Sequence, residues 1–168
     1  MSDKIKSHSC GILLHRTDPK TGDTLVFLGE ANNPRYWNAN RKHPEHIWGL
    51  PKGRMEPGES PLETAKREFE EEVGLPAPNL HYEKTMDFKT PHHKLITVFE
   101  ADATGIEMHF GEPEVITREY PKGSGEFVSY TEFKDAQWIP LDKALTMVMW
   151  GQKGILVHLG TELKKKKN

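Results

Sequence analysis

Three glutamates, Glu68, Glu71 and Glu72, lie within five consecutive positions of a segment whose pattern is helical. At about 100° per residue they share one flank of the helix, with Glu72 nearest to its apolar face. No lysine or arginine is expected at the centre of this flank, and crowded carboxylates repel one another. A hard divalent cation would supply the missing positive charge, because Mg²⁺ and Mn²⁺ prefer oxygen ligands.

The helix that positions these acids is expected at residues 61–73. Ser60 is a typical N-cap, Pro61 suits the first helical position, and Gly74 followed by Pro76 ends the helix. One face is apolar, through residues spaced three and four apart: Leu62, Ala65, Phe69 and Val73. We therefore expect this face to pack on a core, with the acids beside it.

An acidic helix that faces water is a common alternative, and the loop before the helix decides between the two. Residues 53–75 fit the pattern G-x5-E-x7-R-E-U-x-E-E-x-G-U, where U is a bulky apolar residue, at every fixed position. The matching residues are Gly53, Glu59, Arg67, Glu68, Phe69, Glu71, Glu72, Gly74 and Leu75. This segment resembles the Nudix box of the Nudix (MutT-like) hydrolases.

The resemblance implies a loop–helix–loop in which Mg²⁺ or Mn²⁺ binds next to a bound diphosphate. The three glutamates named above would be the metal ligands and catalytic residues, joined by the carbonyl group of Lys52. Arg67 would orient the acids by ion pairing, and Glu59 would brace the loop.

The resemblance also implies an α/β fold, a Nudix-type α/β/α sandwich with a mixed central sheet. Strands are expected at residues 9–16, 25–30, 47–53, 81–88, 94–102 and 115–120, and further helices at 142–149 and 154–163. We expect a single domain over residues 1–168, with its core at about 8–160 and a basic tail at 164–168 that frays into solvent.

The polar loop at residues 31–45 gathers basic and aromatic side chains just before the box: Arg35, Tyr36, Trp37, Arg41, Lys42 and His43. Basic groups bind phosphates and aromatic rings stack on bases, although Tyr36 and Trp37 could equally pin the loop to the core. The W-G-x-P-K-G sequence at residues 48–53 resembles Nudix members that act on dinucleoside polyphosphates. The side chain of Lys52 is therefore a second candidate contact to a phosphate.

Two candidates lie beyond the helix. Lys94, at the edge of a predicted strand, could present its charge to a polyphosphate. The Trp138-Ile139-Pro140-Leu141 sequence resembles the terminal part of many Nudix domains, in some of which a preceding acid is an extra metal ligand. Glu132 is the favoured acid for this role, with Glu126 as the alternative.

Composition excludes several classes of protein. The 168 residues carry 23 basic and 25 acidic side chains, for a net charge of −2, so no strong field favours nucleic acid. The single cysteine, Cys10, is expected to be a small buried residue, as in a reducing cytoplasm. We expect a cytoplasmic protein with neither a secretion signal nor a membrane span. Nothing in the sequence indicates an oligomeric state.

From the resemblance we expect hydrolysis of a phosphoanhydride bond in a nucleoside diphosphate linked to another group. The expected substrate is a small nucleotide, either a dinucleoside polyphosphate or a nucleoside triphosphate. The alternatives are removal of pyrophosphate from RNA 5′ ends and a non-catalytic nucleotide-binding module. Because the box keeps every carboxylate, the binding module ranks below the enzyme.

Overall fold

The computed structural model describes residues 4–37 and 47–167. Within these residues, seven strands form one mixed sheet in which β1 (Ser7–Thr17) lies at the centre. β1 runs parallel to β6 (Lys94–Asp102), and the other pairings are antiparallel. The remaining strands are β2 (Thr24–Ala31), β3 (Trp48–Gly49), β4 (Lys52–Arg54), β5 (Glu83–Lys89) and β9 (Phe133–Pro140).

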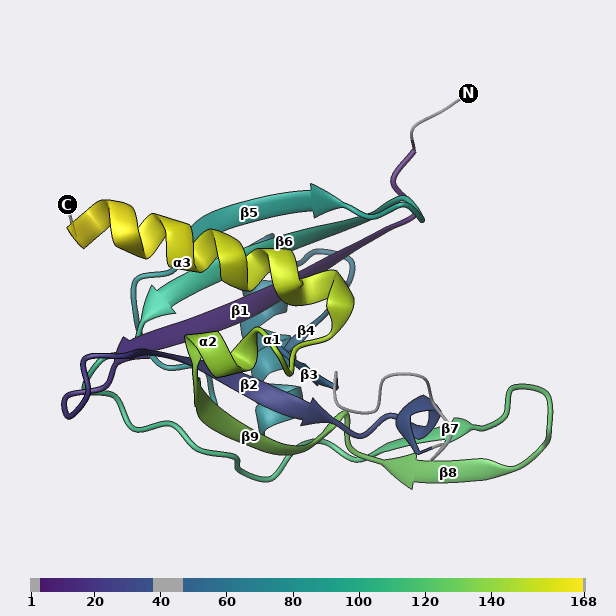
Figure 1. Ribbon diagram of the computed structural model, residues 1–168. Helices are drawn as coiled ribbons and strands as arrows, with labels where there is room; N and C mark the ends of the chain where they lie inside the picture. Colours follow the sequence, from purple (N-terminus) through teal and green to yellow (C-terminus); the bar gives the residue numbers. More distant parts are fainter. Residues whose placement is uncertain (1–3, 38–46, 168) are drawn as a thin grey trace.

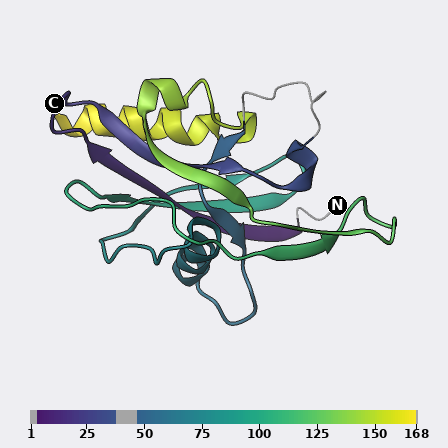
Figure 2. The same ribbon diagram turned by 90° about the horizontal axis from the view of Figure 1, so that it is seen from below.

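Helices cover both faces of this sheet. α1 (Pro61–Val73) packs on one face, while α2 (Leu141–Ala144) and α3 (Lys153–Lys167) pack on the other, as Figures 1 and 2 show. The expected α/β/α sandwich with a mixed central sheet is therefore confirmed. No helix in the described ranges is long and apolar enough to span a membrane.

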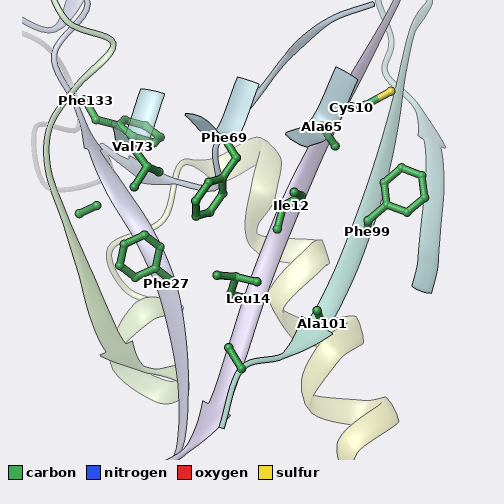
Figure 3. Close-up of a cluster of buried hydrophobic side chains, with 12 residues drawn as sticks. Cys10, Ile12, Leu14, Phe27, Ala65, Phe69, Val73, Phe99, Ala101 and Phe133 are labelled. Atoms are coloured by element: carbon green, nitrogen blue, oxygen red, sulfur yellow. The ribbon is translucent and has the colours of Figure 1, made fainter. Parts of the chain in front are cut away.

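The two layers follow from the alternation of side chains along the central strands. Ile12 and Leu14 of β1 point toward α1, where they join Phe69 in the cluster drawn in Figure 3. Leu13, between them, points the opposite way, into the core beneath α3. Cys10 is a buried free thiol in the α1 layer, as expected.

α1 begins and ends where its sequence predicts. The side-chain oxygen of Ser60 accepts the Glu63 backbone N–H at 3.2 Å, and Gly74 adopts a left-handed φ of 85° at the C-terminus. The segment after β6 then runs along the end of the helix. Its Gly111 and Glu114 N–H groups donate to the carbonyl groups of Val73 and Glu71 at 2.9 and 2.8 Å.

That segment leads into a hairpin outside the main sheet, made of β7 (Ile116–Glu119) and β8 (Phe127–Tyr130). Figure 1 shows the hairpin extending beyond the end of the main sheet. The expected strand at residues 115–120 is confirmed as β7. Its pairing with β8 brings Ile116 opposite Tyr130.

Three expectations for the elements were wrong. The strand expected at 47–53 is broken into β3 and β4, because Pro51 has no N–H and the Leu50 N–H donates instead to the side chain of Gln152 at 2.9 Å. The helix expected at 142–149 ends at Ala144, because the backbone of residues 147–149 bonds to Trp48. The lysine run does not fray after residue 163, since α3 continues to Lys167.

Candidate active site

One face of α1 borders a cleft of about 410 Å³ that also receives residues from the β7–β8 hairpin. Among the described residues six carboxylates line it, and we refer to four of them as the acidic floor: Glu68, Glu71, Glu72 and Glu132. The first three come from α1, and Glu132 comes from the residues between β8 and β9. The structure therefore brings the predicted box acids and the favoured extra acid into one cleft.

Arg67 binds the acids on two sides. Its Nε and Nη2 groups donate to the two carboxylate oxygens of Glu59 at 2.7 and 3.0 Å, in a forked pair. Its Nη1 group donates to Glu68 at 2.9 Å and to Glu71 at 3.2 Å, while Nη2 also reaches the Arg54 carbonyl at 2.9 Å. The ion pairing of Arg67 with the acids, which the resemblance implied, is present in the structure.

These contacts fix the ionisation of Glu59. The forked bonds from Arg67, helped by the Glu56 backbone N–H, lower the pKa of Glu59 to about 2. The hydrogen bonds to Glu59 in turn raise the pKa of Arg67. Glu59 is therefore ionised at any ordinary pH and, through Arg67, ties the box loop to the helix.

Glu72 and Glu68 lie in drier surroundings. Burial, followed by the nearby charge of Glu68, raises the pKa of Glu72 well above its ordinary value, although a Glu72 oxygen accepts the Lys52 backbone N–H at 2.8 Å. Burial also raises the pKa of Glu68, while the bond from Arg67 opposes that shift. Charge repulsion from Glu132 adds to both shifts. The carboxylates of the acidic floor therefore lack enough nearby positive charge to stabilise their ionised forms.

Gly53 is required where the loop meets the helix. A Cβ atom at this position would lie 2.0 Å from the carboxyl carbon of Glu68. The first glycine of the box therefore lets the Glu68 side chain lie directly against the backbone of β4.

The chemistry of the acidic floor fits a hard divalent cation, since every donor is an oxygen and the carboxylates crowd one another. Glu68, Glu71 and Glu72 would hold the ion. Across the described ranges, no three histidine, cysteine or acidic side chains are already gathered in the geometry of a metal site. Glu68 and Glu71 share the Nη1 group of Arg67, and each carboxylate keeps further lone pairs that could bind an ion.

The predicted substrate residues occupy different positions around the cleft. Arg35 and Tyr36 line a smaller adjoining cavity of about 100 Å³, which shares Lys52, Glu72 and Glu132 with the main cleft. The Arg35 guanidinium lies 4.9 Å from the centre of the Tyr36 ring.

Trp37 stands at the edge of this region and is 50% exposed. Its indole N–H donates to the Asn32 carbonyl at 3.0 Å, and its ring meets Tyr130 edge-on at 6.4 Å. Lys52 lies inside the cleft, where burial lowers the pKa of its ammonium group. Of the predicted substrate residues, Lys52, Arg35 and Tyr36 line the cleft or its adjoining cavity, and Trp37 lines neither.

Other candidates are not brought to the cleft. Lys94 is exposed at the start of β6 and does not line it, although its charge acts on Lys52. Glu126 is exposed in the turn of the hairpin, away from the acidic floor. Arg41, Lys42 and His43 lie outside the described residues.

Sequence reasoning missed four residues that line the cleft. Glu56 belongs to the box loop, and its position before Glu59 could have indicated it. Glu114, Ile116 and Arg118 come from the hairpin and its leading segment. No local pattern marks these three, because only the bonds between the 111–114 segment and the end of α1 carry them to the cleft.

The sequence of this chain resembles those of known proteins. Residues 11–159 match the family model of the NUDIX domain. Over 76 residues the chain is 38% identical to a bis(5′-nucleosyl)-tetraphosphatase (asymmetrical) of Sus scrofa, a match that covers 43% of this chain. The match spans less than half of that curated relative, 45% of its length.

Solved structures share the fold over nearly the whole chain. A C. elegans Ap4A hydrolase binary complex has a TM-score of 0.60 at 19% identity, covering 94% of this chain and 98% of that one. The NUDIX domain of Shewanella oneidensis NrtR, in a complex with ADP ribose, has a TM-score of 0.61 at 16% identity, covering 95% and 90%. Because the family model matches most of the chain, the protein belongs to the NUDIX domain family.

Proposed function

We propose that this protein is a hydrolase dependent on Mg²⁺ or Mn²⁺ that cleaves a phosphoanhydride bond in a nucleoside diphosphate linked to another group. The proposed substrate is a dinucleoside polyphosphate or a nucleoside triphosphate. The observation that carries the proposal is the acidic floor, whose four carboxylates line one cleft and two of which, Glu68 and Glu71, share Arg67. Similarity to the pig bis(5′-nucleosyl)-tetraphosphatase supports the dinucleoside substrate.

Glu68, Glu71 and Glu72 would hold the metal ion, with the carbonyl group of Lys52 and the Glu132 carboxylate as further oxygen donors. When bound, the ion supplies positive charge that neutralises the phosphate oxygens and makes water more acidic. The protein itself contributes alignment, because Arg67 holds two of the acids from one side and Glu59 fixes Arg67 from the other.

A carboxylate must accept the proton that the attacking water loses. Glu71 and Glu68 are the candidates, and the Glu71 side chain is the more accessible, at 36% exposed against 15%. Glu59 is unsuited to this role, because its pKa of about 2 makes it a weak base.

The border of the cleft would hold the rest of the nucleotide. Lys52 and Arg35 offer positive charge beside the acidic floor, while Tyr36 and the half-exposed Trp37 offer ring faces for a base.

The test is turnover by the full chain across Ap4A, dNTPs, ADP-ribose, NADH and 5′-triphosphate RNA, with and without Mg²⁺ or Mn²⁺. We expect metal-dependent hydrolysis of Ap4A or a nucleoside triphosphate, which Glu72→Gln abolishes. Turnover of the RNA alone would replace the proposed substrate. Nucleotide binding without turnover of any substrate would contradict the enzyme and favour a sensor.

A further inference from the structure

The β7–β8 hairpin presents one of its faces to the cleft. Ile116 and Arg118 lie two residues apart on β7 and so share a face, and both line the cleft together with the acids of α1. Tyr130 faces Ile116 across the hairpin and is buried, whereas Thr117 and Ser129 bond to each other on the other face at 2.8 Å. The hairpin therefore directs Arg118 toward the cleft through the regular alternation of its strands.

The position of Arg118 is fixed at both ends of the hairpin. Glu114, two residues before β7, donates its backbone N–H to the Glu71 carbonyl of α1 at 2.8 Å. At the far end, the side chain of Glu119 accepts the N–H groups of Gly123 and Gly125 in the turn. An isolated two-stranded hairpin is marginally stable, so these bonds and the buried Tyr130 hold it in place.

Among the residues that the structure describes, three cationic side chains line the cleft, and they differ in their partners. The N–H groups of Arg67 donate hydrogen bonds to Glu59, Glu68, Glu71 and the Arg54 carbonyl. Lys52 lies deep beside Glu72. Arg118 is exposed and forms no ion pair within the described ranges, and its side chain lies beside the phenol of Tyr130. Its guanidinium has five N–H donors, more than the contact with the Tyr130 phenol uses, so others remain available for an anion.

We propose that Arg118 forms a distal phosphate subsite, which binds the phosphates of a polyphosphate chain that extend beyond the diphosphate held over the acidic floor. This inference rests on the proposed function and sharpens it, because such a subsite selects substrates with three or more phosphates in a row. A nucleoside diphosphate linked to a sugar has no phosphate to place there. Arg118 thus distinguishes long phosphate chains from short ones.

The test compares two variants, each of which removes one positive charge from the β7–β8 hairpin. Arg118→Gln eliminates the cation at the cleft, and Lys122→Gln, in the exposed turn, is the matched control. With Mg²⁺ present, we expect Arg118→Gln to raise the KM for Ap4A roughly tenfold, the size of one charge-assisted contact, and to leave kcat within about twofold. The KM for ADP-ribose should change by less than about twofold, and Lys122→Gln should change neither. Arg118→Lys should recover part of the Ap4A affinity.

A second measurement does not require turnover. Calorimetric binding of inorganic tripolyphosphate and pyrophosphate, with Mg²⁺ present, should show a loss specific to tripolyphosphate in Arg118→Gln. Equal losses for both anions, no loss for either, or no polyphosphate binding by the wild type would overturn the subsite. A wild type that binds tripolyphosphate through Arg118 but hydrolyses nothing would instead overturn the proposed function alone.

Discussion

Within the described residues, two groups of acids lie on opposite sides of the sheet, and each contains one glutamate that is shielded from solvent. The acidic floor lies beside α1, and Glu83, Glu100 and Asp102 line a hollow of about 250 Å³ near the C-terminal end of α3. Burial raises the pKa of a glutamate in each group, Glu72 in the first and Glu100 in the second. By the effect of burial alone, Glu72 and Glu100 look alike.

They differ in what holds the carboxylates. Glu68 and Glu71 share the guanidinium of Arg67, and Glu72 accepts a backbone N–H group. The side chains of Glu100 and the neighbouring buried His15 form no hydrogen bond within the described ranges. Clustered acids are therefore insufficient for a site, and the acids of α1 are distinguished by the hydrogen bonds that hold them in one cleft.

The largest expected effect separates the two groups directly. Glu72→Gln should lower the hydrolysis rate by about 10²- to 10³-fold, as for loss of one preorganised charged group in an active site. Glu100→Gln should leave the rate within about twofold, because Glu100 lies on the opposite face of the sheet. Steady-state rates with saturating Mg²⁺ measure both, and comparable losses in the two variants would refute the distinction.

Removing the shared partner should give the next largest effect. Arg67→Ala leaves Glu59, Glu68 and Glu71 without their common donor, so we expect a rate loss of at least about tenfold. The free energy of unfolding should fall by about 2 kcal/mol after allowance for solvent screening. Arg67→Lys should restore little, since a lysine cannot make the forked contact. Full activity in Arg67→Lys would show that charge alone suffices.

The close approach at Gly53 allows a smaller perturbation. Gly53→Ala places a methyl group on the Glu68 carboxylate and should displace it, which weakens Mg²⁺ binding and lowers the rate. Gly154→Ala is the control, because its Cβ meets open space near the start of α3, and it should stabilise the helix by about 0.5–1 kcal/mol. Mg²⁺ titration by calorimetry would separate the two variants. Unchanged affinity in Gly53→Ala would mean that Glu68 is not a ligand.

The smallest effect concerns stability and pH. Because burial raises the pKa of Glu100, this group favours the folded state fully below its unfolded pKa, and that contribution is lost as pH rises through the folded pKa. Lys166 and His158 oppose the shift, whereas Glu83 and Glu162 add to it.

Glu100→Gln should therefore be the more stable protein at pH 8, by about 1 kcal/mol or less, with the gain vanishing near pH 4.5. Both proteins keep His15, so the difference between their urea unfolding curves isolates Glu100. A gain that does not vary with pH would contradict this assignment.

Local signals account for what could be predicted from the sequence. The ends of α1 depend on Ser60, Pro61 and Gly74, and the alternation in β1 and β6 is a property of each strand. Predictions failed where distant partners intervene. The backbone of 147–149 bonds to Trp48 instead of continuing a helix, and Arg118 reaches the cleft only because the segment before it binds the end of α1. Neither contact can be inferred from the residues that are adjacent in the sequence.

The central claim is that the acids of α1, which Arg67 aligns, hold a metal ion. A crystal soaked with Mn²⁺ and a non-hydrolysable Ap4A analogue, measured for anomalous scattering, tests it most directly. We predict an anomalous peak bounded by the carboxylates of Glu68, Glu71 and Glu72, with the phosphate chain against it. A map with no peak beside Glu68, Glu71 and Glu72, and with the nucleotide bound elsewhere, would contradict the account.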